Sequence, residues 1–167
     1  MPFLIQWVEH CSGDKEIVKI KTPVGRLALV VYGDVIAEAD WESSEADLLQ
    51  TECEHPLQAL LDAYWQDPEK AIHLKLLKQG SPFRNKVWAE LCQIPFGETL
   101  TYSALAGKIA SSARAVGGAC RNNPFTLLIP CHRVVAVDGM GGYSGKTEGE
   151  LMAIKQHLLA FEAKHKQ

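Results

Sequence analysis

A change of pattern in the stretch QGSPF constrains the fold of this 167-residue chain most strongly. Gly80 interrupts the preceding segment, Ser81 is a good helix N-cap, and Pro82 suits the first turn of a helix. Before this point apolar residues alternate as in strands, and after it they recur at helical spacing. We therefore predict two domains, residues 1–79 and 80–167.

The first domain is predicted to be a small α+β unit. Three segments rich in Val and Ile, residues 16–22, 25–33 and 35–41, are separated by the short turn sequences TPVG and GD. This spacing predicts an antiparallel meander. Residues 55–68 then place apolar side chains at helical spacing, with Pro56 in the first turn, which predicts a helix. The predicted fold class is therefore α+β, with an antiparallel sheet and one helix in this half.

The second domain is predicted to be mainly helical. After a helix over residues 82–94, Thr101 is placed to cap a short helix. A tight turn at Ala110 and Ser111 then leads to a second short helix, from Ser112 to about Arg121. Two short helices across such a turn form the helix-turn-helix pattern, although many helical proteins contain such pairs.

The second short helix contains two adjacent glycines, Gly117 and Gly118. Each costs about 1 kcal/mol relative to alanine within a helix. Two explanations stay open: close packing against another helix, or insertion into a narrow space such as the minor groove of DNA, which is about 6 Å wide. Arg114 is the one charged side chain in the stretch SSARAVGGAC.

The charge distribution indicates that only the second half meets a polyanion. Residues 1–81 carry 7 basic and 14 acidic side chains, whereas residues 82–167 carry 10 basic and 6 acidic ones. No apolar run reaches the roughly 18 residues of a membrane span. The N-terminal stretch has neither a basic start nor a small-residue cleavage site, so we expect a cytoplasmic protein without a membrane partner.

The five cysteines are odd in number and widely spaced, and no CxxC pair occurs. This pattern favours reduced thiols over a disulfide framework. The first half also contains residue types that bind zinc, but none shows ligand spacing, so we predict no metal. The residues concerned are His10, Cys11, Cys53, His55 and His73.

Cys131 and His132 lie side by side in the stretch LLIPCHRVV. A cysteine flanked by apolar residues is more often a buried structural residue than a reagent. The adjacent histidine, however, offers a base that would generate the nucleophilic thiolate. If the segment is extended, the two side chains point to opposite sides, which favours a bridging water over direct contact.

Five motifs carry a resemblance to a known family. The stretches FGETLTY, ARAVGGACRNNP, LLIPCHRVV, GYSG and LLAFE follow one another between residues 81 and 163. In this order and spacing they resemble the O6-alkylguanine-DNA alkyltransferases, also called methylated-DNA–protein-cysteine methyltransferases. The first half matches only loosely, through TPVG and its strand pattern. The resemblance implies a ribonuclease-H-like first domain and a DNA-binding second domain with a helix-turn-helix.

The resemblance implies a single-turnover reaction at Cys131. This residue matches the alkyl acceptor, His132 matches the base that acts through water, and Glu162 matches the acid that orients the histidine. The alkyl group of O6-alkylguanine in DNA would pass irreversibly to Cys131 without a cofactor, and the sequence leaves O4-alkylthymine open as a second substrate. The register of LLAFE favours Glu162 over Glu148 and Glu150.

The same resemblance implies that the target nucleotide is flipped out of the duplex, because the reacting atom lies inside the base stack. Arg114 matches the arginine that fills the gap left by the flipped base, and Tyr102 matches a proton donor in the base pocket. Asn123 matches a residue that ties the helix-turn-helix to the active-site strand, although asparagine before proline is also common in turns. The other residues implied in substrate binding are Val134, Arg121, Tyr143, Ser144 and Gly145.

Two other functions compete with alkyl transfer. Alkyltransferase-like proteins bind damaged DNA without reacting, but they replace the acceptor cysteine, which is present here. A Cys–His hydrolase would need an oxyanion hole and a cysteine and histidine that are separated in the sequence. We therefore expect alkyl transfer by a protein that binds alkylated double-stranded DNA through the minor groove. We expect a monomer, because one recognition helix suffices to present one base.

Overall fold

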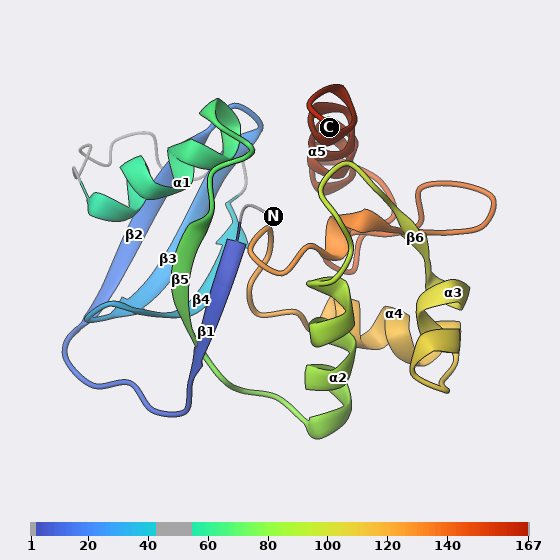
Figure 1. The fold of residues 1–167 in the computed structure, drawn as a ribbon, viewed down its shortest axis with the longest axis horizontal. Helices are drawn as coiled ribbons and strands as arrows, with labels where there is room; N and C mark the ends of the chain where they lie inside the picture. Colours follow the sequence, from blue (N-terminus) through green and yellow to red (C-terminus); the bar gives the residue numbers. More distant parts are fainter. Residues whose placement is uncertain (1–2, 43–54, 167) are drawn as a thin grey trace. The chain divides into compact units, whose positions relative to one another are not determined.

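The computed structural model describes residues 3–42 and 55–166, and contacts within the chain divide it into two units, Met1–Lys78 and Gln79–Gln167 (Figure 1). Each unit has its own secondary structure and its own buried apolar side chains. Within the described residues, no helix is both long and apolar enough to cross a membrane.

The first unit is built on a five-stranded sheet in the order β1-β5-β4-β3-β2. The predicted antiparallel meander is confirmed for β2, β3 and β4. The expectation of a wholly antiparallel sheet is wrong, because β5 runs parallel to both β1 and β4. A helix lies between β4 and β5 in the chain, and such a crossover returns the next strand in the same direction. The strands are β1 Phe3–Val8, β2 Lys15–Thr22, β3 Gly25–Tyr32, β4 Val35–Trp41 and β5 Ile72–Leu77.

Helix α1, Pro56–Gln66, covers one face of this sheet (Figure 1). Alternate residues of β3, Leu27, Leu29 and Val31, are buried, and α1 contributes the buried Tyr64. Alternation with a period of two places such residues on one face of a strand, which is the pattern that predicted the strand. Burial of this apolar face stabilises the first unit.

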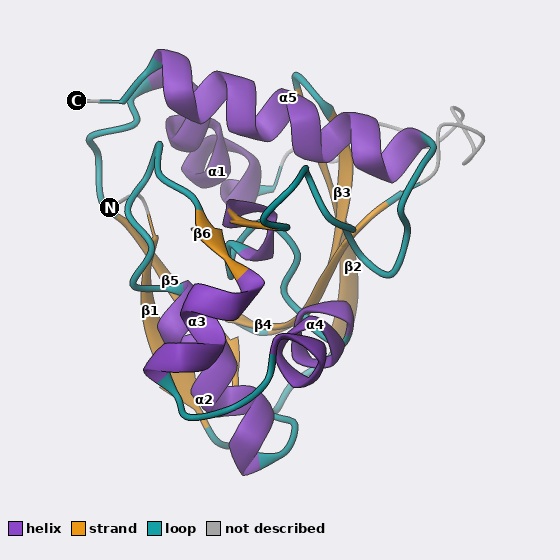
Figure 2. Cartoon of the chain, turned by 90° about the vertical axis from the view of Figure 1, so that its right-hand side faces the viewer, coloured by secondary structure: helices purple, strands orange, loops and turns teal. Residues whose placement is uncertain are grey.

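The second unit is mainly helical and is shown with its helices in purple in Figure 2. A two-stranded parallel pair, β6 with β7, brings the start of the third helix next to the segment that carries Cys131. The predicted helix over residues 82–94 ends earlier, and the chain continues in a tight turn. The elements are α2 Pro82–Leu91, β6 Leu100–Thr101, α3 Tyr102–Lys108, α4 Ala113–Arg121, the 3₁₀ helix η1 Cys131–Arg133, β7 Val134–Val135 and α5 Glu150–Lys164.

Helices α3 and α4 are joined by a turn of four residues. The predicted N-cap Thr101 is present, because its side chain accepts a backbone N–H at 3.1 Å. Ser112, predicted as the first residue of the second helix, is its N-cap and accepts a backbone N–H at the same distance. At the end of α3, Ala110 has a left-handed φ of 53°, and the N–H of Ser111 donates to the carbonyl of Ala106 at 2.9 Å. This bond closes the helix in the manner of a Schellman motif. The turn is as tight as predicted, and its use in DNA binding stays a prediction.

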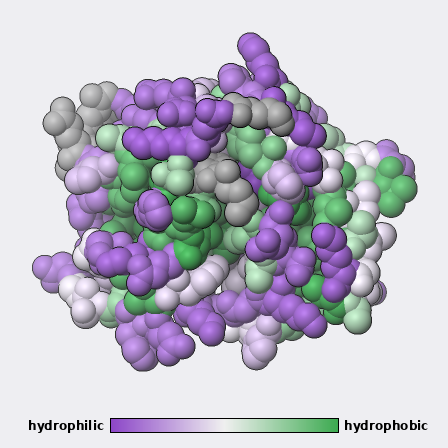
Figure 3. Space-filling view, in the orientation of Figure 1, coloured by the Kyte–Doolittle hydropathy of each residue, from purple (hydrophilic) through white to green (hydrophobic). Residues whose placement is uncertain are grey.

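Some apolar side chains reach the surface, and Figure 3 shows hydrophobic and hydrophilic residues interspersed on the visible face. Single exposed apolar residues are normal in folded proteins and do not by themselves indicate a binding site. The large ones among the described residues are Leu4, Trp7, Ile17, Phe83 and Val137.

Trp88 connects α2 to α4 and explains the glycine that precedes α2. Its indole Nε1 donates to the carbonyl of Ala119 at 2.9 Å, and its side chain is buried. Gly80 has a φ of +86°, and a Cβ there would lie 2.7 Å from the Trp88 ring. Both the conformation and the close approach therefore require glycine.

We expect Trp88→Phe to lower the free energy of unfolding by about 2 kcal/mol, because it leaves the buried carbonyl of Ala119 without its donor and opens a small cavity. Urea unfolding followed by circular dichroism measures the change. The exposed Phe83→Leu serves as the control and should change stability by less than about 0.5 kcal/mol. Equal stability of Trp88→Phe and the wild type would contradict the role assigned to this bond.

Candidate active site

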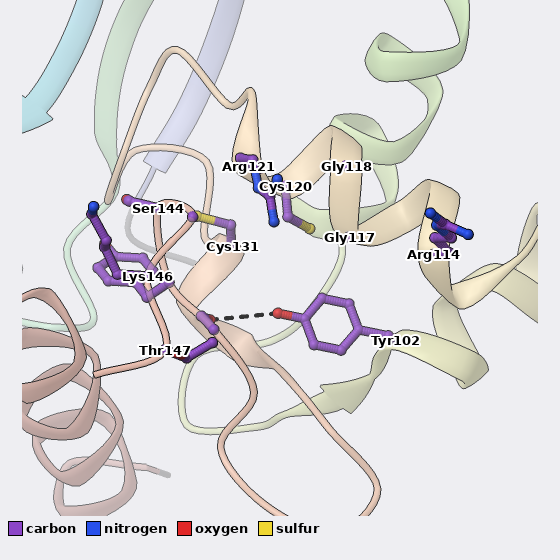
Figure 4. A pocket seen from close by; sticks show the side chains of 13 residues that line it. Tyr102, Arg114, Gly117, Gly118, Cys120, Arg121, Cys131, Ser144, Lys146 and Thr147 are labelled. Carbon is purple, nitrogen blue, oxygen red and sulfur yellow. Dashed lines mark hydrogen bonds between the residues drawn. The ribbon is translucent and has the colours of Figure 1, made fainter.

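A pocket of about 470 Å³ lies within the second unit, between α3, α4, η1 and the loop that precedes α5. In Figure 4, Arg114 and Tyr102 lie on one side of the pocket, and Cys131 and Ser144 lie on the other. Four other residues from the sequence analysis do not line it, namely His132, Asn123, Glu162 and Val134. The lining residues are Tyr102, Arg114, Gly117, Gly118, Cys120, Arg121, Cys131, Gly142, Tyr143, Ser144, Gly145, Lys146 and Thr147.

Cys131 begins η1 and is 5% exposed. The expectation of an extended segment is wrong here, because the N–H of Arg133 donates to the carbonyl of Pro130 at 3.0 Å and closes a 3₁₀ turn. In a 3₁₀ turn successive side chains point about 120° apart rather than to opposite sides. Cys131 therefore lines the pocket, while the next side chain, His132, is buried behind it.

His132 and Glu162 form a buried pair. The Nε2 of His132 lies 2.8 Å from Oε1 of Glu162, and the two residues are no more than 1% exposed. A carboxylate can only accept, so Nε2 carries the proton and Nδ1 presents a lone pair. Among the described residues, Nδ1 is buried without a hydrogen-bond partner. Burial lowers the pKa of His132 despite the opposing attraction of Glu162, so the imidazole is a neutral base.

Arg133 completes this network, and the sequence analysis missed it. Its Nε donates to Oε2 of Glu162 at 2.9 Å, its Nη2 donates to Oε1 at 2.7 Å, and its Nη1 donates to the carbonyl of Ile94 at 2.8 Å. Burial would raise the pKa of Glu162, but three effects outweigh it and hold the pKa at about 2: the charge of His132 when the imidazole is protonated at acidic pH, the hydrogen bonds from His132 and Arg133, and the charge of Arg133. The carboxylate is therefore ionised at neutral pH.

Tyr102 presents its phenol to the pocket from the first turn of α3. The hydroxyl donates to the carbonyl of Gly142 at 3.5 Å. Burial, together with the nearby Cys120 and Cys131, raises the pKa of Tyr102 to about 12. The phenol therefore keeps its proton at neutral pH and can donate it.

A two-residue turn presents Ser144 to the pocket (Figure 4). Tyr143 and Lys146 exchange both backbone hydrogen bonds, at 2.8 and 2.9 Å. Ser144 and Gly145 have φ values of 49° and 79°, which is the pattern of a type I′ turn. A Cβ at Gly145 would lie 3.4 Å from the side chain of Arg121, so this turn and α4 approach closely.

Asn123 joins the segment after α4 to the segment before η1. Its Nδ2 donates to the carbonyl of Ile129 at 3.0 Å, and its Oδ1 accepts from the N–H of Phe125 at 2.9 Å. One bond is local to the turn and the other spans it. Asn123 therefore satisfies a backbone group of its own turn and also ties the segment after α4 to the segment before η1, so both interpretations from the sequence fit this geometry.

Lys155 is the second residue that the sequence analysis left without a role. Its Nζ donates to the carbonyls of Val134 and Met140 at 2.7 Å and to that of Gly142 at 2.8 Å. The carbonyl of Val134, a residue that the resemblance implies in substrate binding, therefore already has one donor and keeps one lone pair. The sequence did contain a signal of its burial. Lys155 lies seven residues, or two helical turns, before Glu162, which places both on the same buried face of α5.

The described residues contain no group of three or more His, Cys, Asp or Glu side chains that could hold a metal. Cys53, one of the residues considered for zinc, lies outside the described residues. Cys11, Cys92, Cys120 and Cys131 are all thiols rather than half-cystines.

Comparison with known proteins gives consistent results. Residues 82–164 match the family model described as 6-O-methylguanine DNA methyltransferase, DNA binding domain. A methylated-DNA–protein-cysteine methyltransferase of Metallosphaera sedula is 35% identical over 84% of this chain and 88% of that protein. A probable one of Acanthamoeba polyphaga mimivirus is 44% identical, but the match spans 57% of this chain and 62% of the relative. The structure of Mycobacterium tuberculosis OGT in complex with DNA superposes with a TM-score of 0.71, at 30% identity over 89% of this chain and 93% of that one.

The carboxylate of Glu162 should make the protein sensitive to acid. Because its pKa of about 2 lies below the ordinary 4.5, its contribution to stability is present above about pH 4.5 and is lost as the pH falls through 2. Glu162→Gln should be about 3 kcal/mol less stable at pH 7, since it leaves Arg133 buried without its anion. Its stability should also fall less than that of the wild type between pH 4.5 and 2.5.

Urea unfolding at a series of pH values measures both effects. Glu148→Gln, a neutralised carboxylate on the exposed loop before α5, is the matched control and should follow the wild type. If Glu162→Gln and the wild type lose equal stability over the acidic range, Glu162 is not held ionised by its neighbours.

Proposed function

The chain belongs to the methylated-DNA–protein-cysteine methyltransferase family, and from this premise we propose that it repairs alkylated DNA by direct reversal. The alkyl group of O6-alkylguanine passes to Cys131: the S–C bond forms as the bond between the alkyl carbon and O6 breaks. The products are intact guanine and a thioether. A thioether sulfur is a poor leaving group, so each molecule acts once.

One observation carries the proposal, namely the His132–Glu162 pair behind a thiol that lines the pocket. The neutral imidazole takes the proton of Cys131 at Nδ1 through a bridging water, and the ionised Glu162 stabilises the imidazolium that forms. The thiolate is the nucleophile, and its burial leaves it poorly hydrated and reactive towards carbon.

Tyr102 supplies the acid of the reaction. When the C–O6 bond breaks, the electron pair stays on guanine, which leaves as an anion unless it is protonated. A phenol that keeps its proton at neutral pH and faces the same pocket as Cys131 can deliver that proton to a ring nitrogen of the base. Ser144, at the tip of its turn, is placed to donate to the guanine oxygen.

Helix α4 is the element proposed to enter the minor groove. Its pocket face carries Gly117 and Gly118, and a Cβ built at either would meet nothing within 4 Å. The free protein therefore has room for a side chain at both positions, which favours close approach to DNA over packing within the protein as the reason for glycine. Arg114, exposed on the same helix, fills the gap left when the target base is flipped into the pocket.

The first test is the mass of the intact protein after incubation with a duplex that carries one O6-methylguanine. We expect a gain of one methyl group, mapped to Cys131, and no gain in Cys131→Ala. Cys92→Ser removes a thiol that does not line the pocket and should still gain the methyl group. A duplex with O4-methylthymine shows whether that base is also a substrate. Selective binding of the lesion without a mass change would make the protein a damage sensor.

The glycines of α4 provide a second prediction. Gly117→Ala and Gly118→Ala should each raise the free energy of unfolding by up to about 1 kcal/mol, because alanine is the better helix former and the added methyl meets no neighbour. The same changes should weaken DNA binding at least tenfold if the helix inserts into the groove. Urea unfolding and fluorescence anisotropy with a labelled duplex measure the two effects.

Gly107→Ala is the matched control, because Gly107 is also helical, also has open space at its Cβ, and does not line the pocket. It should gain stability without losing affinity. Unchanged DNA affinity in both α4 variants would rule out a groove-facing role for these glycines.

A further inference from the structure

Lys155 is fully buried on α5, and its hydrogen bonds hold three backbone carbonyls. Its Nζ donates to the carbonyls of Val134 and Met140 at 2.7 Å and to that of Gly142 at 2.8 Å. An ammonium has three N–H groups, so these acceptors use every donor that it has. Burial lowers the pKa of Lys155 to about 8, so the amine is mostly protonated at pH 7. Lys155 therefore fixes three points of the backbone at once.

Two of these carbonyls belong to residues 140–142, the segment that lies against the ring of Tyr102. A Cβ built at Gly141 would lie 2.9 Å from Cε2 of Tyr102 and 3.4 Å from its phenol oxygen, so the backbone of Gly141 supports the ring. The phenol donates to the carbonyl of Gly142 at 3.5 Å, which is the dashed line in Figure 4. Lys155 thus holds the carbonyls on both sides of the glycine against which Tyr102 packs.

The third carbonyl connects this support to the segment that carries the nucleophile. Val134 follows η1 directly, three residues after Cys131. Strand β7 begins at Val134 and pairs with β6, and Tyr102 is the first residue after β6. Tyr102 and Cys131 are therefore connected by two routes, one through the β6–β7 pair and one through Lys155.

We propose that Lys155 is the positioning residue of the acid, because it ties residues 140–142 to Val134 and so sets where the Tyr102 phenol lies relative to Cys131. This inference rests on the proposed function, in which the phenol protonates guanine as the C–O6 bond breaks. The bonds of Lys155 go to backbone carbonyls, so it acts through Tyr102 and not on the substrate.

The geometry of the phenol suits this role. Its hydrogen bond to Gly142 is long, at 3.5 Å, and the hydrogen bonds of catalytic groups are often long in the free protein and tighten with substrate. A ring held against a fixed support can exchange this acceptor for a nitrogen of the base with little movement. Misplacement of a reacting group by about 1 Å can cost a hundredfold in rate, so the support matters.

This role has a signature that a general effect on folding lacks. Guanine leaves as an anion unless an acid protonates it, whereas iodide is a stable anion and needs no acid. Loss of Lys155 should therefore slow alkyl transfer from O6-methylguanine without slowing the reaction of Cys131 with iodoacetamide.

The test is a double-mutant cycle on the single-turnover rate of methyl transfer from a saturating duplex that carries one O6-methylguanine. We expect Lys155→Met, which has a side chain of similar length without donors, to be slower by about tenfold or more. The double variant Tyr102→Phe/Lys155→Met should be no slower than Tyr102→Phe, because both changes remove the same contribution. Iodoacetamide labelling of Cys131, followed by peptide mass mapping, should match the wild type in Lys155→Met.

Lys164→Met makes the same substitution at an exposed position of α5 and is the matched control. It should match the wild type in both reactions. A folded Lys155→Met that transfers the methyl group at the wild-type rate would overturn the proposal. So would a defect that multiplies with that of Tyr102→Phe, or one that slows iodoacetamide equally, because neither passes through the acid.

A second measurement covers a Lys155→Met variant that fails to fold. The ¹⁵Nζ resonance of Lys155 is assigned in the wild type by scalar couplings across its hydrogen bonds to the three carbonyl carbons, and is then recorded in Tyr102→Phe. We expect the resonance to shift, because the phenol and Lys155 share the carbonyl of Gly142. An unchanged resonance would sink the proposal. This readout needs no alkyl transfer, so a wild-type protein that takes up no methyl group from DNA would contradict the proposed function separately.

Discussion

The carboxylate of Glu162 is the interaction on which the second unit depends. It accepts hydrogen bonds from Arg133 and His132, which follow Cys131 directly in the chain, and so it ties α5 to η1. Through Arg133 the same network reaches the carbonyl of Ile94, beyond the end of α2. Removal of this one anion would leave a buried guanidinium uncompensated and an imidazole without the acceptor that sets its tautomer.

Helix α5 supports the pocket through two polar residues on its buried stripe. Glu162 holds His132, the proposed base, and Lys155, two turns earlier, donates to the carbonyls of Val134, Met140 and Gly142. The segment from Cys131 to Val134 is therefore anchored to one helix at both His132 and Val134. Such support is what holds a reactive group in a productive geometry.

Local features of the fold followed from local sequence. Ser81 and Thr101 cap helices as predicted, because an N-cap depends on a side chain and the backbone three residues on. The meander of β2, β3 and β4 was predicted from alternation and short turns, because its strands are neighbours in the sequence as well as in the sheet. The parallel placement of β5 beside β1 did not, since it pairs residues almost seventy positions apart that share no local signal.

The motifs predicted Tyr102, Arg114 and Cys131 as members of one site, and all three line one pocket. The conformation at Cys131 was not readable, because PCHRV suits a 3₁₀ turn as well as an extended strand. Arg133 and Lys155 also escaped notice, since a basic residue in a sequence is ordinarily solvated. Their importance comes from burial, and burial depends on which segments fold over them. The sequence thus determines which side-chain groups are present, whereas the partner and the charge of each group are set only when distant segments pack together.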